Sequence, residues 1–242
     1  MVAAAVLRRG CNMNGRRDAS GSSQSVEDFL KAVYNLQGER DRVSTNALAD
    51  ALNISAPAVT DMAQRLVDEG TVDYLKYRGV RLTDKGERVA LQMLRRHRLI
   101  ETYLVQDLGY QLHEIHDEAE ALEHSVSDRF VEAIARKLGE PSYDPHGDPI
   151  PNLDGIMQER SLQPLTALKL HSPARIRRFI MDDPAMLQNT QERGLVMGAT
   201  LEVVERDPFD GPVTVCLGAK STQTIGYKMA SSILVEYIDR MC

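Results

Sequence analysis

Apolar side chains recur with helical spacing near the start of the chain. In the stretch SVEDFLKAVYNLQGE, which begins at Ser25, the apolar residues fall on one stripe of a helix, and Ser25 is a suitable N-cap. A second, shorter helix is expected over 46–53, opened by Ser44 or Thr45. A third is expected over 58–70, because Pro57 suits a first turn and the glycine that ends this stretch suits a helix end.

The periodicity changes after the third helix. Residues 71–83, TVDYLKYRGVRLT, contain two β-rich runs around a central Tyr-Arg-Gly, which predicts a hairpin. Thr83 is placed to cap a long helix over 84–108, and one more long amphipathic helix is expected over 114–138. The prolines of the following DPHGDPIPN stretch exclude a helix there, and a short helix is expected near 153–159.

From about Ser172 onward, short apolar runs are separated by glycine and proline. ATLEVVERDP, PVTVCLG and TIGYKMASSILVEYI are each typical of strands, which predicts a small barrel of about 70 residues. Residues 1–24 lack any such period and are expected to form a disordered leader. No apolar run is long enough to cross a bilayer, so a cytoplasmic protein without a membrane partner is expected.

Charge is distributed unevenly along the chain, although the net charge is only −6. Residues 39–100 carry 11 Lys and Arg against 9 Asp and Glu, whereas residues 101–160 carry 4 against 14. We therefore expect an anionic ligand at the first region and a cationic ligand at the second. The three cysteines, Cys11, Cys216 and Cys242, are too dispersed for a disulfide framework or a thiolate zinc site.

The order helix, helix, turn, helix, hairpin is that of a winged helix-turn-helix, which places one short helix in the major groove of DNA. Small and hydroxyl-bearing residues at the start of the third helix would approach base edges, and basic residues of the hairpin would contact phosphates. A helical core with a hairpin and no DNA contact is the alternative. The candidate DNA-binding residues are Thr45, Ser55, Pro57, Ala58, Thr60, Asp61, Arg65, Lys76 and Arg78.

One predicted helix carries histidines and carboxylates at a spacing that suits a metal ion. His116, Glu120, Glu123 and His124 lie at positions i, i+4, i+7 and i+8. These four side chains therefore point within about a quarter-turn of one another. Carboxylates gathered in this way repel one another unless a cation lies between them.

Two further groups could take part in metal binding. His97 and Glu101 form another i, i+4 pair, for which a solvated helix face is the alternative, and Asp144 and His146 lie in the constrained DPHGDP loop. Oxygen and imidazole donors without a thiolate suit Mn²⁺ or Fe²⁺, and the same groups would also bind Zn²⁺ and Co²⁺. Because no glycine-rich phosphate loop, nucleophile elbow or HExxH motif occurs, neither an enzyme nor a small-molecule substrate is expected.

The order of these motifs resembles the diphtheria toxin repressor family of metal-dependent bacterial regulators, and within it the manganese-responsive branch. The resemblance covers residues 25–160, and HDEAEALEH is its most specific stretch. The other matching stretches are SVEDFLKAVYNL, ALADALNISAPAVTDMAQRL, YRGVRLTDKGERVA, RRHRLIETYL and DPHGDPIP. The chain after these stretches is similar to the family's C-terminal SH3-like (FeoA-type) domain.

The resemblance implies two metal sites. In the family, one site is shared between the first helix of the DNA-binding domain and the dimerisation helix, which here implies Asp28, Glu120, Glu123 and His124. Asp28 and Glu120 stand where iron-responsive members have methionine and cysteine, which implies manganese. The second site would use His97 and Glu101 with His116, or with Asp144 and His146.

The expected fold class is mainly α with a small β part. The expected domains are a leader (1–24), a winged helix-turn-helix domain (25–96), a helical dimerisation and metal-binding domain (97–165) and an SH3-like β-barrel (172–242). The expected function is that of a homodimeric repressor of manganese homeostasis, which binds a palindromic operator in double-stranded DNA with Mn²⁺ as co-repressor. The alternatives are an iron-responsive repressor of the same family and, from a different class, a metal-binding hydrolase or metal buffer with a merely structural helix-turn-helix.

Overall fold

The computed structural model describes residues 19–38, 41–181, 183–218 and 221–238. The chain forms two compact units, Met1–Thr83 and Asp84–Cys242. The fold is mainly α with a smaller β part, as predicted. Among the described helices, none is both long enough and apolar enough to span a membrane.

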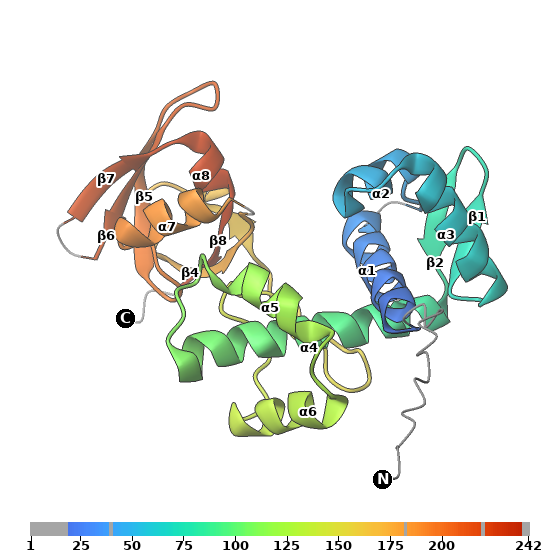
Figure 1. The fold of residues 1–242 in the computed structure, drawn as a ribbon. Coiled ribbons are helices and arrows are strands. Elements are labelled where there is room, and N and C mark those ends of the chain that lie inside the picture. Colours follow the sequence, from blue (N-terminus) through green and yellow to red (C-terminus); the bar gives the residue numbers. More distant parts are fainter. Residues whose placement is uncertain (1–18, 39–40, 182, 219–220, 239–242) are drawn as a thin grey trace, which may run out of the picture. The chain divides into compact units, whose positions relative to one another are not determined.

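The N-terminal unit is a winged helix-turn-helix. It consists of α1 (Ala19–Gln37), α2 (Thr45–Leu52) and α3 (Ala56–Asp68), followed by a hairpin of β1 (Val72–Leu75) and β2 (Gly79–Leu82) (Figure 1). Every one of these elements contributes apolar side chains to the interior of the unit, as the alternation of polar and apolar positions predicts. These side chains are Phe29, Leu30, Val33, Leu48, Val59, Ala63, Leu66, Val72 and Val80.

Short polar residues and one glycine set the ends of these elements. The side-chain oxygen of Ser44 accepts a hydrogen bond from the amide of Ala47 at 3.1 Å, so Ser44 is the N-cap of α2. Gly79 opens β2 with φ +99°, and a Cβ there would lie 2.1 Å from the carbonyl oxygen of Val43. Only glycine therefore allows the antiparallel bridge between Val43 and Val80, which anchors the hairpin to the helices.

The first helix is longer than the sequence pattern indicates. Because α1 begins at Ala19, the prediction that Ser25 caps it is wrong, and the predicted disordered leader is helical over 19–24. The stretch ASGSSQ contains no proline that would stop the helix, so α1 continues in the N-terminal direction from the turn anchored by the buried Phe29 and Leu30. The rest of the predicted leader, residues 1–18, lies outside the described residues.

The second unit is built around the long helix α4 (Asp84–Leu108), as predicted. α5 (Ile115–Glu123) and α6 (Asp128–Lys137) lie on opposite sides of α4 (Figure 1). The prediction of one continuous helix over 114–138 is wrong, because the chain leaves the helix after Glu123 and Ser127 caps α6. This break lets two apolar faces pack against different sides of the same helix.

The predicted helix near 153–159 does not form. The side-chain oxygen of Asn152 accepts hydrogen bonds from the amides of Asp154 and Ile156, at 3.0 and 2.8 Å. An asparagine that bonds to following amides offers the backbone an alternative to the helix, and here this turn replaces it. The DPHGDPIPN stretch is a loop, as its prolines predict.

The C-terminal part of the chain forms an antiparallel sheet in the order β3-β8-β4-β5-β6-β7. The sheet begins at Gln163, before the predicted start near Ser172, and TIGYKMASSILVEYI is not one strand because a helical turn interrupts it. The strands and the helices that accompany them are β3 (Gln163–Pro164), β4 (Ala174–Phe179), α7 (Pro184–Glu192), β5 (Thr200–Arg206), β6 (Val213–Leu217), β7 (Ser221–Ile225), α8 (Tyr227–Ser231) and β8 (Ile233–Tyr237).

The C-terminal sheet shares one hydrophobic core with α4 and α5. Ile100 and Leu104 of α4 and Ile115 of α5 belong to the same buried cluster as Ile176 and Val235 of the sheet. The helices and the sheet are therefore parts of one compact unit. The predicted boundary between residues 96 and 97 falls inside α4, whereas the two units divide at the start of that helix.

Candidate metal centre and DNA-binding surface

His97 lies at the centre of a group of carboxylates on α4 and α5. Its Nε2 is 3.0 Å from Oε1 of Glu101, one turn further along α4, and its Nδ1 is 2.7 Å from Oε2 of Glu123 on α5. The side chains of Glu101 and Glu123 are almost completely buried. Each ring nitrogen of His97 therefore faces a carboxylate oxygen. A positive charge at this place, either a proton on the ring or a metal cation, would offset the two negative carboxylates.

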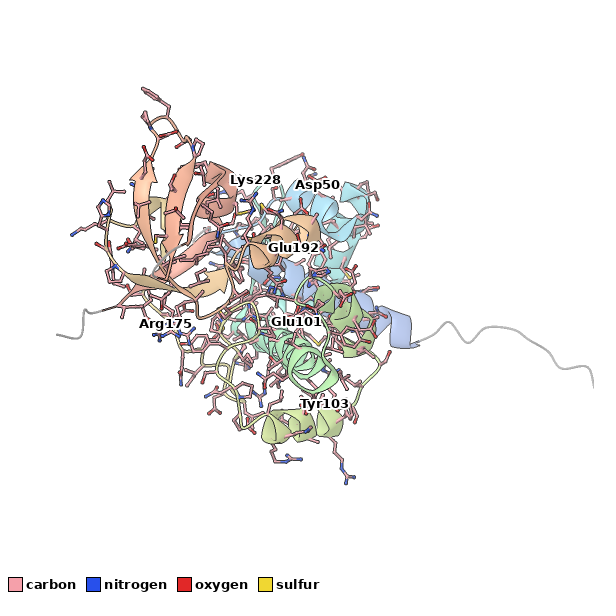
Figure 2. All side chains as sticks on the ribbon, turned by 90° about the vertical axis from the view of Figure 1, so that its left-hand side faces the viewer. Asp50, Glu101, Tyr103, Arg175, Glu192 and Lys228 are labelled. Carbon is pink, nitrogen blue, oxygen red and sulfur yellow. The ribbon has the colours of Figure 1, made fainter. Side chains whose placement is uncertain are left out.

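Glu101 is surrounded by imidazoles. Its Oε1 lies 3.0 Å from His97, 3.6 Å from Nδ1 of His116 and 4.0 Å from Nε2 of His146. Burial by itself would raise the pKa of Glu101, but the contacts with His116 and His97 outweigh it and lower the pKa (Figure 2 labels this residue). The structure thus brings together residues from α4, α5 and the DPHGDP loop that the sequence assigned to a second metal site.

A second set of ligand atoms lies at the end of α5. Glu120, Glu123 and His124 each offer one ligand atom, and these atoms lie within 4.8 Å of one another. His124 lies beyond the last residue of α5 but keeps a right-handed helical conformation. The predicted i, i+4, i+7, i+8 arrangement is therefore retained. Asp28 lies half-buried on α1 in the N-terminal unit, and its assignment to this site rests on the sequence.

Asp144 and His146 behave differently within the DPHGDP loop. Oδ1 of Asp144 accepts hydrogen bonds from the amides of His146 and Asp148, both at 2.9 Å, and its Oδ2 lies 3.6 Å from Nε of Arg98. Burial, followed by the charges of Asp148 and Glu101, raises the pKa of Asp144 well above its usual value. Because Asp144 accepts these two amides it shapes the loop, whereas the ring of His146 lies beside Glu101.

The donor atoms suit a divalent cation. Burial lowers the pKa of His146, which favours the neutral imidazole that a metal requires. His97, His116 and Glu120 also place one ligand atom each within 4.8 Å of one another. Carboxylate and imidazole donors without a cysteine among them form a site of the kind that Mn²⁺ or Fe²⁺ prefers.

Most of the predicted DNA-binding residues are exposed on the surface of the N-terminal unit. Ser55 is the N-cap of α3, and Pro57, Ala58, Asp61 and Arg65 are exposed along the same helix. Lys76 and Arg78 are exposed at the tip of the hairpin, whereas Thr45 is half-buried at the start of α2. The hydroxyl of the half-buried Thr60 donates to the carbonyl of Ala56 at 3.1 Å, so its methyl group and the acceptor side of its oxygen are left for a base contact.

Sequence reasoning missed the arginines that support the metal-binding loop. Arg98 of α4 lies beside Asp144, and Arg178 of β4 forms an ion pair with Asp148. The position of Arg98 directly after His97 gave little signal, because adjacent side chains of a helix point about 100° apart. The partner of Arg178 could not be found in this way, because it depends on how the sheet packs against the loop.

Three known protein families match successive parts of the chain. The family described as "Iron dependent repressor, N-terminal DNA binding domain" matches residues 22–80, and "Iron dependent repressor, metal binding and dimerisation domain" matches residues 83–152. The FeoA domain matches residues 163–237. The three matches follow one another along the chain in the order that the resemblance predicts.

Whole-length relatives agree with these matches. The chain is 27% identical over 226 residues to the iron-dependent repressor IdeR of Mycobacterium tuberculosis, covering 88% of this chain and 97% of the relative. A solved manganese-dependent transcriptional repressor in complex with manganese is 39% identical, with a TM-score of 0.79, and the match covers 88% of this chain and 100% of that one. The structure of ScaR with bound Zn²⁺ is 33% identical with a TM-score of 0.72, over 88% and 99% of the two chains.

These matches favour a regulator over the alternative of a metal-binding hydrolase or metal buffer. The helix-turn-helix belongs to a matched DNA-binding domain, and the imidazole and carboxylate cluster belongs to a matched metal-binding and dimerisation domain. The chain therefore belongs to the iron-dependent repressor family, that of the diphtheria toxin repressor, whose members are metal-dependent, DNA-binding transcriptional repressors.

Proposed function

We propose that this protein represses genes of manganese homeostasis and uses Mn²⁺ as its co-repressor. The observation that carries the proposal is the thiolate-free group of imidazoles and carboxylates around His97 and Glu101. Hard oxygen donors combined with imidazole suit Mn²⁺ better than a metal that prefers sulfur. The 39% identity to a solved manganese-dependent repressor supports the same metal.

The first proposed site consists of Asp28, Glu120, Glu123 and His124. Three of these residues already place ligand atoms together at the end of α5. Asp28 belongs to the DNA-binding unit, so a cation bound by all four residues would connect that unit with α5. Charge compensation is what the ion supplies there, because the carboxylates otherwise repel one another.

The second proposed site consists of His97, Glu101, His116 and His146. All three imidazoles lie within 4.0 Å of the same Glu101 oxygen, which favours both His116 and His146 as ligands. Asp144 is proposed to orient His146 rather than to bind the ion, because its carboxylate already accepts two loop amides. His97 lies between the two sites, since its other nitrogen faces Glu123.

We further propose that the protein acts in the cytoplasm as a homodimer on a palindromic operator, with the third helix of each copy in the major groove. Dimeric helix-turn-helix proteins bind half-sites about one helical turn apart, so the spacing of the two recognition helices decides which duplexes bind. Regulation requires neither a catalytic step nor a small-molecule substrate. Metal binding and DNA binding are then coupled in both directions, because each stabilises the same arrangement.

Iron is the second candidate, because the iron-dependent repressor of Mycobacterium tuberculosis is 27% identical over most of this chain. A duplex selected from random sequence with the Mn²⁺-loaded protein would be titrated at one salt concentration with Mn²⁺, anaerobic Fe²⁺, Zn²⁺, Co²⁺ or chelator. The proposal expects tight binding with Mn²⁺ and loss of binding with chelator. Binding that follows Fe²⁺ and not Mn²⁺ would identify an iron repressor, and binding unaffected by chelator would contradict a metal co-repressor.

A further inference from the structure

An irregularity in β4 turns two consecutive arginines away from the hydrophobic core. Ile176 pairs with Val235 and Arg178 pairs with Leu234, so Arg177 is an extra residue on this strand and forms a β-bulge. Ile176 and Phe179 are buried on either side of the bulge, whereas Arg177 and Arg178 are only half-buried. Bulges re-aim side chains in this way and are common beside functional sites.

The bulge contacts the DPHGDP loop through three consecutive residues. The amide of Phe179 donates to the carbonyl of His146 at 2.8 Å, and the guanidinium of Arg178 forms an ion pair with the carboxylate of Asp148. Gly147 has φ +88°, and a Cβ there would lie 1.9 Å from the carbonyl oxygen of Arg177. The loop therefore lies directly against the strand at a position where only glycine fits.

The opposite side of the same loop is fixed by α4. Arg98 donates to the carbonyl of Pro149 and lies beside the carboxylate of Asp144. Asp144 in turn accepts the amides of His146 and Asp148. The loop is thus closed on itself and attached on one side to the helix that carries Glu101 and on the other to the C-terminal sheet.

We propose that Arg178 is a positioning residue for the metal site, through which the C-terminal sheet keeps His146 beside Glu101 before any metal binds. This inference rests on the proposed function, in which His146 is a ligand. Ordering a loop costs conformational entropy, and a loop that is already ordered does not incur this cost when the metal binds. Loss of residues that orient ligands typically weakens metal affinity about 10- to 100-fold.

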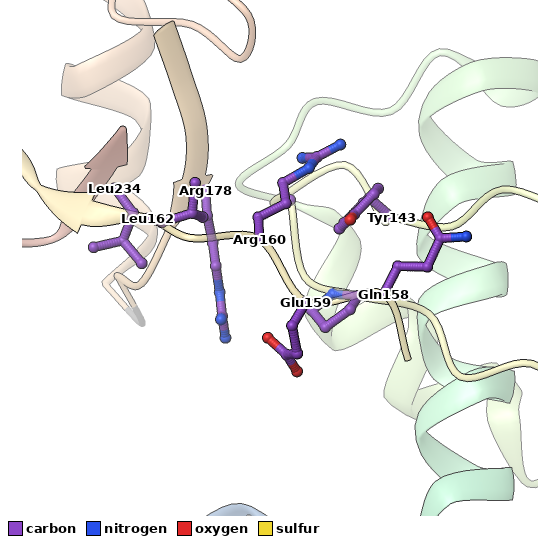
Figure 3. Close-up of a pocket in the computed structure, with 9 residues that line it drawn as sticks. Tyr143, Gln158, Glu159, Arg160, Leu162, Arg178 and Leu234 are labelled. Carbon is purple, nitrogen blue, oxygen red and sulfur yellow. The ribbon is translucent and has the colours of Figure 1, made fainter. Parts of the chain in front are cut away.

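The Arg178 side chain borders open space and lies outside the hydrophobic core. A cavity of about 190 Å³ opens next to Arg178, between the loop and the sheet (Figure 3). Tyr143 and Arg160 line the same cavity, with the Arg160 guanidinium 3.3 Å from the centre of the Tyr143 ring. Because the Arg178 side chain borders this open space and is 31% exposed, we expect its truncation to leave the core intact.

The neighbouring arginine provides a matched control. Nε of Arg177 lies 2.8 Å from Oε2 of Glu236 on β8, and its contact with the loop is made by its backbone carbonyl. Arg177→Ala therefore removes the same charge from the same bulge without removing the ion pair to the loop. Asp148→Asn removes that ion pair from the loop side, together with a longer contact of 3.9 Å with Arg98, and it tests the proposal if Arg178→Ala does not fold.

The experiment measures hydrogen–deuterium exchange of residues 143–150 in the metal-free, full-length protein and then Mn²⁺ affinity by calorimetry. We expect Arg178→Ala and Asp148→Asn to exchange faster than wild type in this loop and to bind Mn²⁺ at one site about 10-fold more weakly, whereas Arg177→Ala matches wild type. The proposal would be overturned if residues 143–150 exchanged at the wild-type rate in both Arg178→Ala and Asp148→Asn. It would also be overturned if Arg177→Ala accelerated exchange in this loop as much as those two variants. If wild type itself failed to bind Mn²⁺, the proposed function would fall, and loop exchange alone would decide the role of Arg178.

Discussion

His97 is the residue at which the two proposed metal sites meet. Its two ring nitrogens contact Glu101 on its own helix and Glu123 on α5, and its ring lies edge-on to that of His116 with 5.1 Å between the ring centres. A side chain in this position contacts a ligand of each proposed site, Glu101 and Glu123. The loss of one imidazole here should therefore affect both sites at once.

Replacement of His97 by alanine should weaken Mn²⁺ binding at both sites, by at least about 10-fold at each. His171→Ala is the control, because His171 lies in the turn before β4, outside the proposed ligand set. Calorimetry with Mn²⁺ would measure both variants. Two binding events of wild-type strength in His97→Ala would show that His97 is not a ligand and does not orient one.

Asp73 is a second residue with a defined electrostatic role, in the hairpin of the N-terminal unit. Its Oδ2 lies 2.6 Å from Nη2 of Arg42 and 3.1 Å from Nε of Arg81. The hydrogen bond from Arg42 is the largest influence on this carboxyl and lowers its pKa. The ionised carboxylate therefore favours the folded hairpin.

This ion pair should make the stability of the N-terminal unit depend on acid pH. Because the pKa of Asp73 is lower in the folded state, its contribution is complete above the ordinary carboxyl value of 3.8 and is lost as the pH falls through the folded pKa. Asp73→Asn should lower the free energy of unfolding at pH 7 by less than about 1 kcal/mol, since the pair is partly exposed. Thermal unfolding at pH 7 and pH 3 would test this, and an equal loss at both pH values would contradict it.

At the scale of elements, periodicity predicted most of the helices but not where the chain bends. The helices of the N-terminal unit, the hairpin and α4 follow from apolar spacing, the Ser44 cap and turn glycines, whereas the start of α1 does not. The break between α5 and α6 was not predicted, because the apolar period continues through 124–127 and only packing on two sides of α4 separates the helices. The resemblance predicted a second metal site at His97 and Glu101 with either His116 or the loop residues Asp144 and His146. The spacing alone could not choose between these, since the choice depends on how α5 and the loop pack against α4.

The hairpin and the third helix should contribute differently to DNA binding. Arg78, exposed at the hairpin tip, is expected to contact a phosphate, so Arg78→Ala should weaken all duplexes alike and reduce the salt slope by about one unit. Pro57→Ala on α3 should instead relax sequence preference. Arg129→Ala, which removes an exposed arginine from α6, is the control for charge. A changed base preference with an unchanged salt slope in Arg78→Ala would contradict the assignment of the hairpin.

At the scale of the whole molecule, the protein consists of two compact units that match domains with different functions. The N-terminal unit matches the family's DNA-binding domain, and the second unit contains the match to its metal-binding and dimerisation domain, with the group of imidazoles and carboxylates, and the C-terminal sheet. Only Asp28 among the proposed ligands belongs to the N-terminal unit. The proposed switch therefore depends on that one carboxylate, and coupling between metal and DNA should disappear with it.

The most direct measurement is duplex binding by Asp28→Ala with and without saturating Mn²⁺, alongside Mn²⁺ calorimetry of the same variant. Glu120, Glu123 and His124 remain, so Asp28→Ala should still bind Mn²⁺, about 10- to 100-fold more weakly. Its duplex affinity should hardly respond to Mn²⁺, whereas Glu123→Ala should lose metal affinity and response together. Full Mn²⁺-dependent duplex binding by Asp28→Ala would contradict the account and would place the switch at His97 and Glu101 instead.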